Sequence, residues 1–165
     1  EVLKETNKRK DIIIATKMRF ARDREKHTFL LRDDDWQPGA SEENLIKQLN
    51  VSLERLQTDY IDILYLHSCY SPEMAAYEPL MNAMVKAKNM GKARFIGVST
   101  HSDEPNVIRA AADTGVYDVV LTAYNFVQDH KNEVKKAIQY AAEKGVGVVA
   151  MKTQGGGRLP HDDAR

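Results

Sequence analysis

Two basic side chains, Lys17 and His67, each stand at the end of an apolar run. Lys17 ends the run Asp11-Ile-Ile-Ile-Ala-Thr-Lys, and His67 ends the run Asp59-Tyr-Ile-Asp-Ile-Leu-Tyr-Leu-His. Short apolar runs of this kind predict buried parallel strands. In α/β proteins the carboxyl ends of such strands carry the chemistry, so both side chains are candidates for a reactive site.

Strand periodicity indicates which of these side chains share a face. Side chains alternate along a strand, so Tyr65 lies on the face of His67, and Ala15 lies on the face of Lys17. If the two faces point the same way, the ammonium and the imidazole meet at one end of the sheet. The strands alone leave two alternatives open, a lysine that reaches solvent and a histidine that is hydrogen-bonded in the core.

Composition limits the class of protein. The chain has 165 residues, and its 24 Lys and Arg balance its 24 Asp and Glu, so no basic excess indicates a nucleic-acid partner. Hydrophobic residues make up 42% and charged residues 29%, which is typical of a soluble globular domain. No apolar run reaches the roughly 18 residues of a membrane span, so we expect no membrane partner.

The single cysteine and the first residue lead to two further expectations. Cys69 is the only cysteine, which excludes an internal disulfide and favours a reducing, cytoplasmic compartment. The chain begins at Glu1, shows no signal peptide, and opens on residues typical of the end of a helix. We therefore expect the natural protein to begin upstream.

The hydrophobic pattern predicts alternating strands and helices. The expected strands are 12–17, 61–66, 93–98, 117–122 and 146–151, and the expected helices are 41–56, 78–89, 103–114 and 130–144. Ser41 is an expected N-cap, Ser102 or Asp103 is another, and glycines at 91, 115 and 145 are expected to end helices. We expect every strand to be covered on both faces. The pattern fits a doubly wound sheet or a closed barrel.

Three segments resemble one known family. Residues 52–67, 10–17 and 91–99 are similar to segments of the aldo-keto reductases, in the family's order and over nearly the whole chain. The resemblance implies a (β/α)8 barrel that binds NADPH without a Rossmann domain. It places residues 1–165 on the third to seventh strands, so we expect a partial barrel of about five strands, a domain incomplete at both ends.

The resemblance also implies a reaction, the transfer of a hydride between NADPH and a small carbonyl or alcohol substrate. Lys17 and His67 match the lysine that lowers the pKa of a proton-donating tyrosine and the histidine that orients the carbonyl. The family's aspartate and tyrosine have no counterpart in this chain, and Tyr65 is interpreted as a core residue. We therefore expect the chain alone to be inactive.

Five residues are candidates for cofactor binding. Ser99 matches a family serine that bonds the nicotinamide carboxamide, and Thr100 follows it where the family often has Asn. Met151 stands where many members stack a tyrosine on the nicotinamide, and Lys152 is a candidate for cofactor phosphate. Gly155 opens a run of three glycines that fits close to a pyrophosphate or forms a simple flexible loop.

Other polar groups have weaker interpretations. The acidic run 33–35 with Trp36 lies in the long loop 18–40 and either lines the substrate site or is a solvated turn. The segment 161–163 is interpreted as solvated tail, and His101 is close enough in sequence to Ser99 to contact cofactor or substrate. We expect no metal site, because a metal-dependent hydrolase needs several ligands at strand ends and only His67 qualifies.

Two functions of different kinds therefore remain. The leading hypothesis is an NADPH-dependent carbonyl reductase or alcohol dehydrogenase, motivated by Lys17, His67 and Ser99 in their matching segments. The alternative is a non-catalytic nicotinamide-binding or regulatory subunit on the same barrel, which the missing aspartate and tyrosine leave open.

Overall fold

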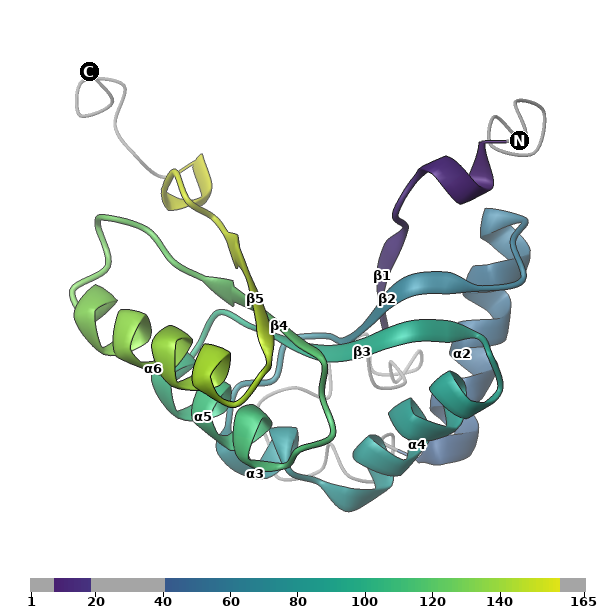
Figure 1. Ribbon diagram of the computed structural model, residues 1–165, viewed down its shortest axis with the longest axis horizontal. Coiled ribbons are helices and arrows are strands. Elements are labelled where there is room, and N and C mark those ends of the chain that lie inside the picture. Colours follow the sequence, from purple (N-terminus) through teal and green to yellow (C-terminus); the bar gives the residue numbers. More distant parts are fainter. Residues whose placement is uncertain (1–7, 19–40, 158–165) are drawn as a thin grey trace, which may run out of the picture. The chain divides into compact units, whose positions relative to one another are not determined.

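The computed structural model describes residues 8–18 and 41–157, which form an α/β structure around one five-stranded sheet (Figure 1). The strand order is β1-β2-β3-β4-β5, and the pairs β1–β2, β3–β4 and β4–β5 are parallel. The strands are β1 (Ala15–Met18), β2 (Ile61–Leu66), β3 (Ala93–Thr100), β4 (Val119–Ala123) and β5 (Gly147–Met151). The helices are α2 (Glu42–Leu56), α3 (Pro72–Ala75), α4 (Glu78–Asn89), α5 (Glu104–Asp113) and α6 (Lys131–Glu143), with 3₁₀ turns η1 (Arg9–Asp11) and η3 (Gly155–Gly157).

The chain divides into two compact units. Unit 1 comprises Glu1–His67 and Tyr77–Ile96, and unit 2 comprises Ser68–Ala76 and Gly97–Arg165. Unit 1 therefore holds β1, β2, α2, α4 and the first half of β3. Unit 2 holds the second half of β3 with β4, β5, α3, α5 and α6.

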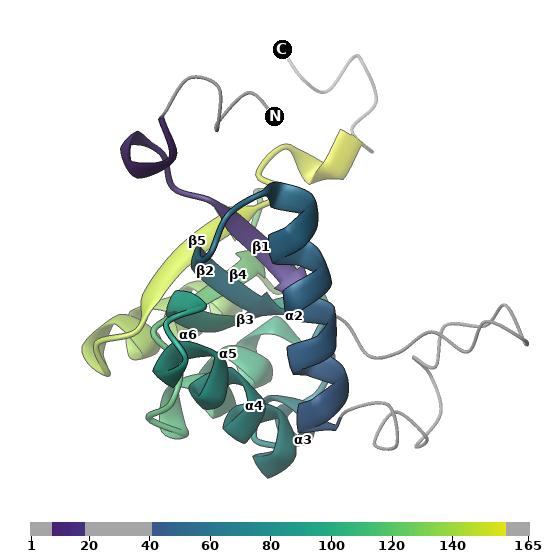
Figure 2. The same cartoon turned by 90° about the vertical axis from the view of Figure 1, so that its right-hand side faces the viewer.

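In unit 1, helices α2 and α4 pack against each other (Figure 2). The leucine stripe of α2 is buried at Leu45, Leu49 and Leu53, as its helical spacing predicts. The predicted cap is confirmed, because the Ser41 hydroxyl accepts a hydrogen bond from the Asn44 backbone N–H at 3.2 Å. The helix ends at Gln57, which adopts the left-handed conformation (φ 52°).

In unit 2, helices α5 and α6 lie side by side (Figure 1), with α5 against β4 and α6 against β5. Gly97 of β3 is in register with Val119 of β4. A Cβ atom at position 97 would lie 2.0 Å from the Val119 carbonyl oxygen, so only glycine allows the two strands to approach this closely.

The first strand differs most from its prediction. Strand pairing begins with the Ile14 carbonyl, which accepts hydrogen bonds from the backbone N–H groups of Asp62 and Ile63. Ile12 and Ile13 therefore precede β1, and Ile13 is 77% exposed. The predicted start at residue 12 was wrong, because Ile12 is already extended directly after the η1 turn but backbone pairing with β2 begins only at the Ile14 carbonyl.

Smaller corrections apply elsewhere. Strand β3 runs two residues beyond its predicted end, and β4 begins at Val119 rather than 117. The short helix α3 is not among the predicted helices, although Ser71 caps it by accepting a hydrogen bond from the Met74 N–H at 3.3 Å. The expectation that every strand is covered on both faces was wrong for β1 and β5. These are the two edge strands of the sheet, and most of their residues are exposed or half-buried.

Candidate active site

Lys17 and His67 lie at the carboxyl ends of two adjacent strands of unit 1. Lys17 is in register with Tyr65, and the Met18 carbonyl accepts a hydrogen bond from the His67 backbone N–H at 2.7 Å. Residues in register on parallel strands point to the same face, and His67 follows Tyr65 by two residues, so all three side chains share one face. The structure therefore places the two predicted catalytic side chains on one face, at the ends of neighbouring strands.

The environments of these side chains differ. Lys17 is exposed and His67 is half-buried. Within residues 8–18 and 41–157, no carboxylate lies within ion-pair distance of the Lys17 ammonium. Its charge is therefore available to another group that approaches this end of the sheet.

Tyr65 shares the face of these two side chains but does not replace the family's tyrosine. Its side chain is 3% exposed, and burial raises the pKa of its phenol. A tyrosine that donates a proton beside a lysine needs the opposite shift, because a nearby ammonium favours the phenolate. The structure thus agrees with the predicted core role of Tyr65.

In unit 2, Ser99 lies near the carboxyl end of β3 and is 1% exposed. Its hydroxyl accepts a hydrogen bond from the Ser68 backbone N–H at 3.1 Å, and its carbonyl accepts one from Cys69 N–H at 2.8 Å. The Cys69 thiol is buried, and burial raises its pKa, so it is no nucleophile.

Thr100 points to the opposite face of β3 from Ser99, because strand side chains alternate. It is fully buried, and its hydroxyl donates to the Ser102 carbonyl oxygen at 2.7 Å. Thr100 therefore shapes the turn that follows Ser99, while the cofactor contact suggested for it stays a prediction.

Sequence reasoning missed a contact between Ser68 and His101. The Ser68 Oγ and the His101 Nε2 share a hydrogen bond of 2.9 Å, and Ser68 adopts the left-handed conformation (φ 62°). The only sequence signal was the position of His101, two residues beyond Ser99. Its partner is 33 residues away along the chain.

The third group of predicted residues begins at Met151, the last residue of β5. Met151, half-buried, accepts a hydrogen bond at its carbonyl from Tyr124 N–H at 3.1 Å. Lys152 is exposed and left-handed (φ 54°), and its carbonyl accepts from Gly155 N–H at 2.9 Å. A Cβ atom at Gly156 would lie 3.6 Å from the Lys152 Cδ. The glycines thus form a turn beside an exposed ammonium, which suits a phosphate group.

A second polar cluster of unit 2 was not predicted from the sequence. Glu104 is 3% exposed, and its carboxylate accepts from the Gln128 Nε2 at 3.1 Å and bonds the His130 Nε2 at 2.9 Å. The cluster borders a cavity of about 630 Å³ that His101 also lines. Each of these side chains has a partner within the cluster, so we interpret it as a link between the starts of α5 and α6.

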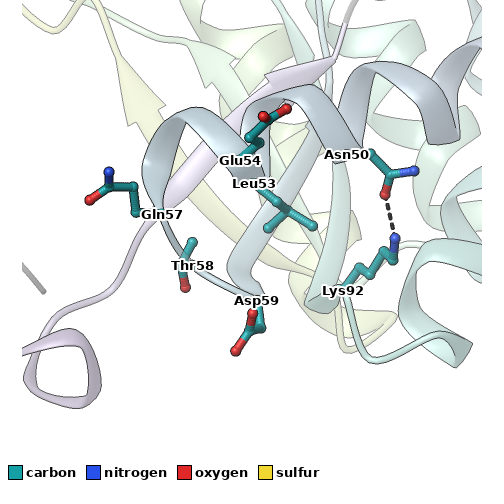
Figure 3. Close-up of a pocket in the computed structure, with 7 residues that line it drawn as sticks. All are labelled: Asn50, Leu53, Glu54, Gln57, Thr58, Asp59 and Lys92. Carbon is teal, nitrogen blue, oxygen red and sulfur yellow. Dashed lines mark hydrogen bonds between the residues drawn. The ribbon is translucent and has the colours of Figure 1, made fainter. Parts of the chain in front are cut away.

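Unit 1 has an open groove of about 570 Å³ (Figure 3). Its lining includes residues that come just before β2 and β3, so it lies at the amino ends of these strands, opposite to the end that carries His67. Its lining comes from the end of α2, the approach to β2 and the residue before β3: Asn50, Leu53, Glu54, Gln57, Thr58, Asp59 and Lys92. The Lys92 ammonium donates to the Asn50 side-chain oxygen. The groove faces away from the predicted chemistry.

Two of the weaker predictions cannot be placed, and the metal and membrane expectations concern only the described residues. The acidic run 33–35, Trp36 and the segment 161–163 lie outside the described residues. Within the described ranges, no group of three or more His, Cys, Asp or Glu side chains is placed to hold a metal ion. In the same ranges, no helix is long and apolar enough to cross a membrane.

Comparison with known proteins agrees with this geometry. The model of the aldo/keto reductase family matches residues 1–165. The aldo-keto reductase yakc [NADP(+)] of Schizosaccharomyces pombe is 36% identical over 122 residues, covering 74% of this chain and 33% of the relative. A methylglyoxal reductase, DkgB of Salmonella typhimurium, is 27% identical over 128 residues, covering 78% of this chain and 47% of the relative.

A solved structure gives the same result for the fold. The holo form of aldo-keto reductase AKR11C1 from Bacillus halodurans superposes with a TM-score of 0.70 and 29% identity, over 94% of this chain and 48% of that one. The chain thus spans about a third to a half of the length of these relatives. The predicted partial (β/α)8 barrel is confirmed. The chain belongs to the aldo/keto reductase family.

Proposed function

We propose that the protein carrying this chain transfers a hydride between NADPH and a small carbonyl or alcohol substrate. Membership of the family implies nicotinamide-dependent oxidoreduction. The observation that carries the finer proposal is the shared face of Lys17 and His67 at the carboxyl ends of β1 and β2. The two curated relatives support the chemistry by name, one with NADP(+) and one with the reduction of methylglyoxal.

Each of the two side chains has a distinct role in this proposal. The Lys17 ammonium lowers the pKa of a proton-donating phenol, which the family resemblance places outside this chain. The His67 imidazole, half-buried beside the strand end, donates a hydrogen bond that orients the carbonyl oxygen. When bound, the nicotinamide supplies the hydride, so these residues only position the substrate and manage its proton.

The cofactor groups of the proposal come from unit 2. We assign the nicotinamide carboxamide to Ser99, with Thr100 shaping the turn behind it. Met151 would offer its thioether to the nicotinamide ring. Lys152 and the turn that Gly155 opens hold cofactor phosphate, which the exposed ammonium and the Cβ-free turn fit. NADPH rather than NADH is part of the proposal.

The same proposal covers the extent and location of the domain. Residues 1–165 form part of one barrel domain, incomplete at both ends and inactive alone. Its partners are small-molecule carbonyls. The cytoplasm suits the one cysteine of the chain, whose thiol is buried and protonated.

The test compares two lysine variants in the protein as its gene encodes it, including any flanking segments. Lys17→Met should lower NADPH oxidation with an aldehyde about 10²–10⁴-fold, because it removes support for the proton donor. Its affinity for NADPH should stay unchanged. Lys10→Met, at an exposed lysine of the η1 turn, is the matched control and should keep the wild-type rate. An unchanged rate in Lys17→Met rejects the proposal.

The second candidate is a non-catalytic nicotinamide-binding subunit. The sequence leaves it open, because the family's aspartate–tyrosine pair has no counterpart in these 165 residues. This function predicts that the gene-encoded protein binds NADPH but turns over no aldehyde or ketone. Turnover that depends on Lys17 would exclude it.

A further inference from the structure

We propose that His101 and Ser68 form a positioning pair for Ser99, and so for the nicotinamide carboxamide. This inference rests on the proposed function, because it takes Ser99 as the carboxamide contact. His101 is a positioning residue here, since it acts on the cofactor only through Ser68 and Ser99. All three residues belong to unit 2.

Two consecutive hydrogen bonds connect His101 to Ser99 through Ser68. The His101 Nε2 and the Ser68 Oγ are 2.9 Å apart. The Ser68 backbone N–H in turn donates to the Ser99 Oγ at 3.1 Å. One lone pair of the Ser99 hydroxyl is therefore committed to Ser68, which limits the directions in which this hydroxyl can bond a ligand.

Ser68 needs outside support to keep its conformation. Its φ of 62° is left-handed, which residues other than glycine adopt at a cost. The neighbouring Cys69 N–H is bonded to the Ser99 carbonyl at 2.8 Å, which fixes the chain on the far side of Ser68. The bond from Ser68 Oγ to His101 fixes the residue itself. Without it, the Ser68 N–H is free to turn away from the Ser99 hydroxyl.

The two residues at the ends of this hydrogen-bond series, Ser99 and His101, differ in burial. Ser99 is 1% exposed, whereas His101 is exposed at the rim of the unit-2 cavity. A substitution at His101 therefore leaves the core of unit 2 intact and changes only the support of Ser68. This makes the pair testable without unfolding the protein.

The experiment measures NADPH affinity and steady-state kinetics in the gene-encoded protein. His101→Asn should weaken NADPH binding about fivefold, the effect of one lost hydrogen bond. His101→Gln should stay within about twofold of wild type, because its amide nitrogen extends to the position of Nε2, which the shorter Asn does not reach. The two variants share an amide group, so their difference isolates the contact with Ser68.

A double-mutant cycle tests whether His101 acts through Ser68. Ser68→Gly removes the hydroxyl while keeping the backbone N–H and tolerating the left-handed conformation. Adding His101→Asn to Ser68→Gly should weaken NADPH binding no further. His130→Ala, at a histidine of unit 2 that is bonded to Glu104 instead, is the control and should leave NADPH affinity unchanged.

The outcomes separate the two proposals. Equal NADPH affinity in His101→Asn, His101→Gln and wild type overturns the inference alone, as do additive effects in the double-mutant cycle. A wild-type protein that binds no NADPH overturns the proposed function and this inference with it. Weakening in His101→Asn with rescue in His101→Gln supports the positioning pair.

Discussion

The two ends of the β1–β2 pair hold charged side chains in opposite ways. At the amino end, the Asp62 carboxylate is buried and bonded to Arg9, Arg94 and the Ile14 backbone N–H. At the carboxyl end, Lys17 is exposed, with no ion pair in the part of the chain that the structure describes. The negative charge of Asp62 is therefore paired within the protein, whereas the positive charge of Lys17 is available to a group that binds at this end of the sheet.

The amino end is built around one carboxylate. Arg9 bonds Asp62 at 2.9 Å, Arg94 bonds it at 3.1 Å, and the Arg9 guanidinium lies 3.9 Å from the centre of the Tyr60 ring. Burial raises the pKa of Asp62, but the hydrogen bonds from Ile14 N–H, Arg94 and Arg9 outweigh it and hold this pKa below its usual value. The cluster joins the η1 turn, β2 and β3 within unit 1.

This difference between the two ends of the strands matches a known division of roles in parallel sheets. In barrels the amino ends of strands serve stability and the carboxyl ends serve chemistry. If unit 1 follows this division, a substitution near Asp62 should change folding, and a substitution near Lys17 or His67 should change turnover. Four predictions test the comparison.

The largest effect is expected at the carboxyl end. His67→Ala should lower turnover of the gene-encoded protein by about 10²–10³-fold, the usual cost of losing a hydrogen-bond donor to a carbonyl oxygen. The free energy of unfolding should change by less than about 1 kcal/mol, because the side chain is only half-buried. Steady-state kinetics and urea unfolding measure the two quantities. A large loss of stability with normal turnover would reverse the comparison.

At the amino end, Asp62→Ala should lower the free energy of unfolding by about 3 kcal/mol, because it leaves the partly buried Arg9 without its carboxylate. Turnover per folded molecule should stay at the wild-type level. Asp59→Ala, an exposed carboxylate three residues earlier, is the control and should cost less than about 0.5 kcal/mol. An equal loss of unfolding free energy in Asp62→Ala and Asp59→Ala would show that the contacts of Asp62 with Arg9 and Arg94 do not stabilise the fold.

The two arginines should differ. The Arg9 side chain is 17% exposed and the Arg94 side chain 64%. Arg9→Ala should therefore cost about 2 kcal/mol, since it also loses the closer contact with the Tyr60 ring, 3.9 Å from the ring centre against 5.6 Å for Arg94. Arg94→Ala should cost less than about 1 kcal/mol. Urea unfolding of both variants measures the difference. The reverse ranking would place the main ion pair at Arg94.

The smallest effect is a dependence of stability on pH. Because the pKa of Asp62 is lower in the folded chain than the ordinary 3.8, its contribution is complete above that value and is lost as the pH falls through the folded pKa. The gap in unfolding free energy between wild type and Asp62→Asn should therefore narrow on acidification. Urea unfolding at pH values from about 6 down to about 2 measures it. A gap that widens in acid would contradict the lowered pKa.

Local signals in the sequence predicted much of the fold. Ser41 before two glutamates predicted the start of α2, and the structure shows its capping hydrogen bond. The helix ends predicted at Gly91, Gly115 and Gly145 are confirmed, since all three are left-handed. Asp103 precedes α5 as one of the two predicted caps, but its side chain makes no capping hydrogen bond. Capping and turn chemistry depend on neighbours in sequence, so one sequence reveals them.

Contacts between distant residues were harder to predict. Asp62 was interpreted only as part of an apolar strand, because its partners Arg9 and Arg94 lie 53 and 32 residues away. The Ser68–His101 bond was missed for the same reason. Lys17 and His67 became candidates because each ends an apolar run, and the family resemblance then placed both runs on strands of one barrel. Hydrogen bonds and ion pairs between residues far apart in sequence follow no regular spacing along the chain, so a single sequence does not reveal them.

The burial of Cys69 gives this protein a built-in probe. The chain of 165 residues has one thiol, which is 1% exposed, and its raised pKa keeps it in the unreactive form. An alkylating reagent can reach the Cys69 thiol only when unit 2 opens locally around this side chain. The rate of modification, followed by mass spectrometry, therefore reports local opening beside the Ser68–Ser99 contacts without an engineered label.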